Sequence, residues 1–213
     1  MTTPVSRARR SQASRRASSH ALILDAAVEL LVERGYSGTT TIAIQDRAGV
    51  TRGRLLHHFP SREALLVAAA HHLADERIVD MEQWFERLQD SAPGGGARVD
   101  RAIALLWSTF WQPYFWAAME LWSVARTDEK LRNELAGAEH RLGRAIQHVV
   151  ATMFGPVHSS HPEFDDVREL LFSSMRGVAL TYSIISRDQE TDPHLTLWQS
   201  VARRMLGVAA DAE

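Results

Sequence analysis

Four basic or titratable side chains stand together in the segment 51–59, TRGRLLHHF: Arg52, Arg54, His57 and His58. A guanidinium group donates two parallel hydrogen bonds, which match the O6 and N7 acceptors that guanine presents in the DNA major groove. Leu55 and Phe59 lie four residues apart, so in a helix both would face inward while the basic side chains face outward. The segment therefore predicts a short helix that contacts base edges, mainly through Arg54 and also through Arg52.

A tight turn precedes this helix. Its residues are Ala48-Gly49-Val50-Thr51, in which Gly49 accommodates the positive φ that a sharp turn can need. The Thr51 hydroxyl is placed to accept a hydrogen bond from a free N–H at the start of the helix, as N-cap residues do. Together with the segment that starts at Thr41, the pattern predicts two short helices that cross steeply, a helix-turn-helix.

Two longer helices are predicted to flank this motif. In the first, apolar residues recur at helical spacing before Gly35, which is placed to end the helix: Ile23, Ala27, Leu30 and Leu31. The threonines at 39–41 are N-cap candidates for the next helix. Ser61, with Glu63 in the first turn, marks the start of a helix that reaches about Leu88.

The segment from 23 to 66, ILDAAVELLVERGYSGTTTIAIQDRAGVTRGRLLHHFPSREALL, resembles the DNA-binding domain of the TetR family of transcriptional regulators. The motifs AGVT, RGRLLHHF and PSREALL carry this resemblance. It implies an all-α protein with a three-helix DNA-binding domain at 20–66 and a helical ligand-binding and dimerisation domain at 67–213. We expect Thr41 and Arg62 to bind phosphates, and the full set of expected DNA contacts is Thr41, Thr51, Arg52, Gly53, Arg54, His57, His58 and Arg62.

Two residues depart from the family pattern. Leu56 stands where the family usually has a Tyr that often contacts phosphate, and Leu has no hydrogen-bond donor. We expect that contact to be missing, or to be made by His57 or His58. Gln45 stands where the family favours a small Ala, so it either tilts outward or changes the packing of the two helices. Arg62 replaces a phosphate-contacting Lys, which keeps the positive charge.

The positive charge is concentrated at the N-terminal end of the chain. The net charge is −2, yet residues 1–60 contain nine Arg against four Asp and Glu. Such asymmetry favours a nucleic-acid partner at the basic end. The segment 1–19 has few apolar residues and predicts a disordered arm when DNA is absent. Its arginines either bind a minor groove or phosphates, or belong to a dispensable tail: Arg7, Arg9, Arg10, Arg15 and Arg16.

Composition and missing motifs argue against other classes of function. The chain has no Cys, which excludes disulfides and thiolate metal sites, and it has no apolar run of about 18 residues that would span a membrane. The basic start lacks the apolar core of a signal peptide, so we expect a cytoplasmic protein. His71 with Asp75, and His158 with His161, lack the further ligands that a metal site needs. We expect no cofactor and no enzyme activity, since no phosphate loop or catalytic nucleophile motif is present.

After residue 66 the apolar pattern is helical and shows no strand alternation. SAPGGG at 91–96 predicts a flexible break. The further helices are expected at about 98–111, 113–126, 128–154, 165–187 and 193–206.

Aromatic side chains cluster in the segment 105–122, LLWSTFWQPYFWAAMELW, which holds four of the six Trp residues. They either line a small-molecule cavity, as the resemblance implies, with Tyr114 and Glu120 as polar anchors, or simply fill the core. We predict an unknown apolar or amphipathic effector that contacts residues from this segment and from a later helix: Trp107, Trp111, Tyr114, Phe115, Met119, Trp122, Phe172 and Met175.

The last two predicted helices carry apolar residues at helical spacing. In the first these include Val167, Leu170, Leu171 and Val178, and the second contributes Leu195, Trp198, Val201, Ala202, Met205 and Leu206. Two copies would form a four-helix bundle across a two-fold axis. The alternative is burial of both sets within one subunit.

These features predict a homodimeric, sequence-specific transcriptional regulator. We expect a repressor that binds double-stranded DNA at a palindromic operator and that a ligand releases. A dimer fits this expectation because two recognition helices spaced by about 34–36 Å contact the two half-sites of a palindrome. The alternative is a ligand-independent, weakly sequence-specific nucleoid-type DNA-binding protein, and an all-α enzyme is a more distant one.

Overall fold

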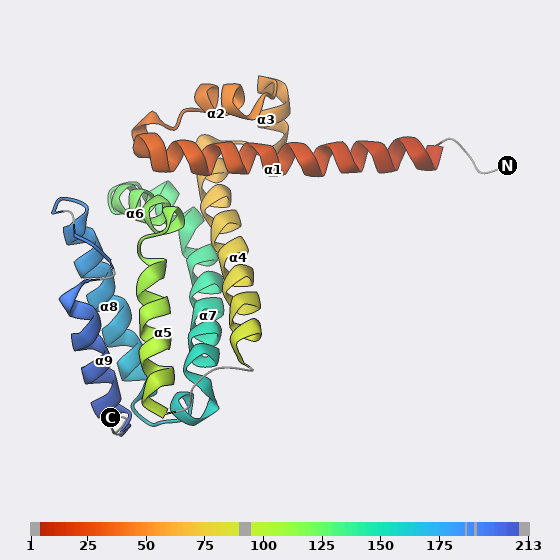
Figure 1. The fold of residues 1–213 in the computed structure, drawn as a ribbon. Coiled ribbons are helices and arrows are strands. Elements are labelled where there is room, and N and C mark those ends of the chain that lie inside the picture. Colours follow the sequence, from red (N-terminus) through yellow and green to blue (C-terminus); the bar gives the residue numbers. More distant parts are fainter. Residues whose placement is uncertain (1–4, 90–94, 186, 190, 209–213) are drawn as a thin grey trace. The chain divides into compact units, whose positions relative to one another are not determined.

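The structure, a computed structural model, is helical throughout the residues that it describes, which are 5–89, 95–185, 187–189 and 191–208. For some residues the structure describes the backbone but not the side chain: 5–18, 73, 74, 76, 77, 80, 81, 83–89 and 138. The side chains of the five arginines predicted to form a basic arm are among these. The predicted all-α fold is confirmed (Figure 1). The helices are α1 (Val5–Gly38), α2 (Thr41–Ala48), α3 (Arg52–His58), α4 (Arg62–Gln89), α5 (Gly95–Thr109), α6 (Pro113–Ala125), α7 (Glu129–Ser159), α8 (Phe164–Tyr182) and α9 (Pro193–Met205).

The chain forms two compact units. The first comprises residues 1–76 and 116–140, and the second comprises 77–115 and 141–213. In the first unit α1 packs on α2, and residues of α1 to α4 share one core with the second half of α6 and the start of α7. Ala117, Leu121 and Leu131 belong to that core because they are fully buried against it. This division differs from the sequence-based boundary at 66, since long-range packing adds residues 116–140, from α6 and α7, to the helices that were predicted to bind DNA.

In the second unit α5 packs along α9, and α8 also contacts α9 (Figure 1). Arg203 on α9 forms an ion pair with Asp100 on α5, and Gln199 donates a hydrogen bond to the Asp100 carbonyl oxygen at 3.3 Å. Several apolar residues predicted for a dimer interface are buried within this subunit: Val167, Leu171, Trp198, Ala202 and Leu206. Burial within one subunit, the alternative that the sequence left open, therefore holds for these five residues.

Helix α1 begins at Val5, whereas the sequence predicted a disordered arm over residues 1–19. The physical reason for the difference is that α1 is already nucleated by its buried apolar residues from Ile23 onward. Extension of an existing helix adds one hydrogen bond per residue and avoids the cost of a new nucleus. Residues 1–4 of the predicted arm lie outside the described residues.

Local sequence signals set most helix boundaries as predicted. Gly49 has φ 63° and ends α2, and the Thr51 hydroxyl accepts a hydrogen bond from the Arg54 N–H at the start of α3. Pro193 begins α9 next to Asp192, the N-cap. Two further boundaries differ. Helix α7 continues as a helical turn to Ser159 after a kink at Gly155, where a loop was predicted, and α8 ends at Tyr182, whereas a helix to residue 187 was predicted.

Gly35 breaks α1 in a backbone region that only glycine adopts readily. Its φ is 64° and its ψ is −177°, and a Cβ at this position would lie 2.9 Å from the Glu120 Oε2 atom of α6. The adjacent Tyr36 N–H donates a hydrogen bond to the same oxygen at 2.8 Å. The chain thus leaves α1 through a turn that α6 holds in place.

We predict that Gly35→Ala lowers the free energy of unfolding by about 1–3 kcal/mol, because alanine is strained at this φ and ψ and also crowds Glu120. Urea denaturation measures the change. Gly53→Ala is the matched control, since an added Cβ at Gly53 meets nothing within 4 Å. Equal stability of Gly35→Ala and the parent would contradict this account of the turn.

Candidate nucleic-acid interface

Helix α3 presents its basic residues to solvent because its apolar residues anchor it from behind. Leu55 is 2% exposed and Phe59 is 5% exposed, and both belong to the core of the first unit. Arg52, Gly53, Arg54 and His57 are exposed, and Thr51 caps the helix. A short, capped helix with two outward guanidinium groups has the shape and chemistry to enter a major groove.

Residues of α1 lie beside this helix, and sequence reasoning missed them. Arg54 Nη1 donates a hydrogen bond to the Ser19 hydroxyl at 3.4 Å. The His20 ring lies 5.6 Å from the His58 ring and 5.0 Å from the Phe59 ring, and His57 and His58 are also 5.6 Å apart. The surface around α3 therefore includes Ser19 and His20. Their partners are more than thirty positions away in the sequence, so no local pattern identifies them.

The start of α2 shows which threonine caps the helix. The Thr40 hydroxyl accepts a hydrogen bond from the Ala43 N–H at 3.2 Å, and the Thr39 hydroxyl donates to the Gly35 carbonyl at 2.8 Å. Thr41, the predicted phosphate contact, is half-buried in the first turn of α2. A hydroxyl at this helix end lies where the macrodipole also favours an anion.

Arg62 connects α4 to the turn after α1. Its Nε donates to the Thr39 carbonyl at 2.7 Å, and its Nη2 donates to the Tyr36 carbonyl. The guanidinium carbon lies 4.1 Å from the centre of the Tyr36 ring. Sequence analysis predicted a phosphate contact for Arg62, and the structure adds an intramolecular role that its position in the motif did not reveal.

The two departures from the family pattern are at different depths. Leu56 is 48% exposed on α3, next to His57, so an apolar side chain stands on the predicted DNA-facing surface. Gln45 is half-buried, and its backbone carbonyl accepts the Val50 N–H at 3.1 Å in the turn. The longer side chain at position 45 is thus compatible with a normal turn between α2 and α3.

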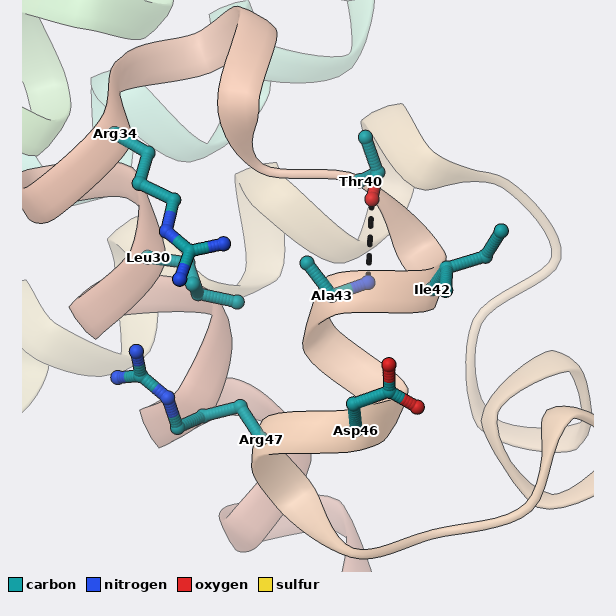
Figure 2. A pocket seen from close by; sticks show the side chains of 7 residues that line it. All are labelled: Leu30, Arg34, Thr40, Ile42, Ala43, Asp46 and Arg47. Atoms are coloured by element: carbon teal, nitrogen blue, oxygen red, sulfur yellow. Dashed lines mark hydrogen bonds between the residues drawn. The ribbon is translucent and has the colours of Figure 1, made fainter.

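A pocket of about 600 Å³ lies between α1 and α2, within the first unit. In Figure 2 the side chains of Arg34 and Arg47 extend toward one another beside Leu30, and Asp46 lies on the other side. Arg47 forms ion pairs with Glu29 at 2.7 Å and Glu33 at 2.8 Å. Its hydrogen bond lowers the pKa of Glu33. The acidic neighbours neutralise Arg47, and no residue of the predicted effector site lines this pocket.

The predicted effector residues divide between the two units. Six belong to the second unit, where Trp107, Phe115 and Met175 are buried and the other three, Trp111, Tyr114 and Phe172, are half-buried. The centres of the Trp107 and Trp111 rings are 5.5 Å apart. The centre of the Phe110 ring lies 5.2 Å from that of Phe115 and 6.1 Å from that of Phe172. Met119 and Trp122 belong to the first unit. Glu120, expected as a polar anchor of that cavity, is instead exposed and binds the Tyr36 N–H.

Comparison with known proteins agrees with the geometry of the first unit. Residues 23–69 match the family described as bacterial regulatory proteins, tetR family. The HTH-type transcriptional regulator CymR of Pseudomonas putida is 26% identical over 182 residues, which cover 85% of this chain and 87% of CymR.

Solved structures show the same fold over nearly the whole chain. A transcriptional regulator from Rhodococcus sp. Rha1 superposes with a TM-score of 0.66 at 17% identity, covering 91% of this chain and 99% of that one. The transcriptional regulator FadR from Bacillus subtilis, solved in complex with stearoyl-CoA, has a TM-score of 0.59 at 17% identity over 87% of this chain and 97% of its own.

We predict that Arg62→Ala lowers the free energy of unfolding by about 1.5–3 kcal/mol, because the Thr39 and Tyr36 carbonyls both lose a charged donor, although the Tyr36 carbonyl still accepts the Thr39 N–H. Urea denaturation without DNA measures this. Arg52→Ala, which removes an exposed guanidinium from α3, is the control and should leave stability within about 0.5 kcal/mol. If Arg62→Ala unfolds at the same urea concentration as the parent, the contacts of Arg62 with the turn do not stabilise the unit.

Proposed function

We propose that this chain, whose residues 23–69 match the family described as bacterial regulatory proteins, tetR family, is a homodimeric repressor that a small molecule releases from a palindromic operator. Its DNA-binding helix-turn-helix is α2 and α3. The observation that carries the proposal is the capped helix α3, with Arg52 and Arg54 exposed over a buried Leu55.

Base recognition is assigned mainly to Arg54. An exposed guanidinium fits guanine bidentately, and each good pair of this kind contributes about 1–3 kcal/mol of discrimination against another base. Arg52, His57 and His58 lie on the same short helix and complete the surface that enters the groove. Thr41 and Arg62 are proposed to hold phosphates, at the starts of α2 and α4.

A dimer interface is assigned to the outer face of α8. Leu170 is 41% exposed and Leu180 is 42% exposed, and both share a helix face with the exposed small residue Gly177. Leu197 on α9 is 54% exposed and offers a further apolar contact. Exposed leucines flanking a glycine allow two helices to approach closely, and a two-fold axis would pair this face with its copy.

Release by an effector requires that the ligand bind one form of the protein more tightly than the other. The aromatic residues of α5, α6 and α8 in the second unit are the proposed contacts, and the stearoyl-CoA complex of FadR supports ligand binding by a protein of this fold. The ratio of the effector's affinities for the two forms sets the largest shift that it can produce in the equilibrium between them.

A nucleoid-type protein that binds DNA without sequence preference is the second candidate, favoured by the basic N-terminal sequence. Both candidates lose affinity as salt rises, because phosphate contacts release counterions. Only the repressor discriminates strongly among sites of equal length, so competition between sequences at one salt concentration separates the two.

We predict that Arg54→Ala costs about 1–3 kcal/mol at the preferred site and relaxes the preference at one base position of each half-site. Fluorescence anisotropy with single-base variants of that site measures both effects. Arg47→Ala is the matched control, because its guanidinium is held in ion pairs with Glu29 and Glu33. It should leave base preference unchanged. An unaltered preference in Arg54→Ala would remove Arg54 from base recognition.

We predict that Leu170→Glu yields monomers in sedimentation velocity, because the dimer would bury two carboxylates in an apolar contact. Val157→Glu is the control, since Val157 is 80% exposed in the same unit but lies on α7. Dimers that persist at micromolar Leu170→Glu would place the interface on another face.

A further inference from the structure

A hydrogen-bonded group of polar side chains joins the end of α8 to the start of α9 in the second unit. Tyr182 Oη lies 3.1 Å from His194 Nδ1, which lies 2.8 Å from Asp192 Oδ1. The His194 N–H donates to the same Oδ1 at 2.9 Å, so Asp192 is also the N-cap of α9. Burial, followed by the nearby Asp192 carboxylate, raises the pKa of Tyr182 and keeps its hydroxyl neutral.

The Asp192 carboxylate is buried and incompletely satisfied. Its side chain is 0% exposed, and its Oδ2 has no hydrogen-bond partner among the described residues. A buried carboxylate oxygen without a donor is costly, and native proteins retain few such atoms. His194, its partner through Oδ1, is 38% exposed. The site therefore lacks one N–H donor.

Aromatic rings pack around Tyr182 and His194, the two side chains of this group that have rings. The Trp107 ring lies 4.8 Å from Trp198, Trp111 lies 6.0 Å from Tyr182, and Trp198 lies 5.6 Å from His194. The indole N–H groups of Trp107 and Trp111 are buried and also lack an acceptor in the described part of the chain. Flat rings of this kind favour flat ligands, and their faces attract cations.

A cation already occupies one of these faces. The guanidinium carbon of Arg187 lies 5.8 Å from the centre of the Tyr182 ring, and Arg187 is exposed. Arg187 thus places a cation of the protein itself at a ring face that a ligand cation could take.

We propose that Tyr182, Asp192 and His194, with Trp107, Trp111 and Trp198, form a binding site for a small planar organic cation that carries N–H groups, such as an amidinium or a protonated aromatic amine. Asp192 Oδ2 accepts a hydrogen bond from the ligand, and the rings hold its flat body. The inference rests on the proposed function, because it assigns a chemical class to the effector. Asp192, His194 and Trp198 lie outside the set of effector residues predicted from the sequence.

Benzamidine and benzamide provide the test, because they share size and shape and differ in charge. We expect saturable quenching of tryptophan fluorescence by benzamidine with the full-length protein, without DNA. We also expect a dissociation constant at least about tenfold lower than for benzamide, as a charge-assisted hydrogen bond implies. Equal affinities, or no saturable binding of either probe, would overturn the proposal. Isothermal titration gives the same ratio independently of fluorescence.

Asp192→Asn removes the charge and keeps an N-cap residue, so it should abolish the preference for benzamidine. Asp188→Asn is the matched control on the same segment and should retain the preference, since Asp188 is exposed. Arg187 is exposed, so Arg187→Ala should leave the core intact. This variant should bind benzamidine several-fold more tightly, because the Arg187 guanidinium no longer covers the Tyr182 ring. A retained preference in Asp192→Asn, or unchanged binding in Arg187→Ala, would contradict the site.

The cation site and the repressor function can be tested independently of one another. Operator binding by the same preparation is measured without any probe. Operator binding with no benzamidine preference overturns only the cation site, whereas benzamidine binding with no sequence preference for DNA overturns only the repressor.

Discussion

The backbone of Tyr36, at the end of α1, is bound by side chains from α4 and α6, and these contacts determine the position of the predicted recognition helix α3. Glu120 of α6 accepts the Tyr36 N–H, and Arg62 of α4 binds the Tyr36 carbonyl. Both contacts require the turn that Gly35 makes with φ 64°. Because α2 starts three residues after Gly38, the direction in which the chain leaves α1 fixes where α2 and then α3 can lie. The proposed DNA-contacting surface is thus set by a backbone turn and by Glu120 and Arg62, two charged side chains that bind this turn from other helices.

Signals that act within a few residues were predictable from the sequence. Gly49, Thr51 and the spacing of Leu55 and Phe59 defined the helix-turn-helix, because caps, positive φ and apolar spacing act locally. The partners of Tyr36 are 26 and 84 positions away in the chain, and no local pattern shows them. Sequence analysis therefore assigned Arg62 to phosphate alone and Glu120 to a ligand cavity.

Apolar spacing also did not show whether a helix face packs within its own subunit or against a second subunit. Trp198, Ala202 and Leu206 have the period of an interface, and they are buried against their own subunit. A period shows that a face is covered, and only packing shows by what. The same limit applies to the aromatic segment, where polar atoms from α9 complete a group that the α5 and α6 sequence does not contain. The two proposed sites consequently differ in how far the sequence predicts them. The proposed DNA-binding site depends mostly on local motifs, whereas the proposed effector site depends on contacts between distant helices.

Selection from a random pool of DNA duplexes at about 150 mM salt tests the central claim most directly, because sequence preference and two-fold symmetry appear in one measurement. We predict enrichment of a palindrome whose half-site centres are one helical turn apart, about 10–10.5 base pairs, or a multiple of that spacing. Recovery of bound DNA without an enriched sequence would contradict it, and would leave a protein that binds the phosphate backbone alone.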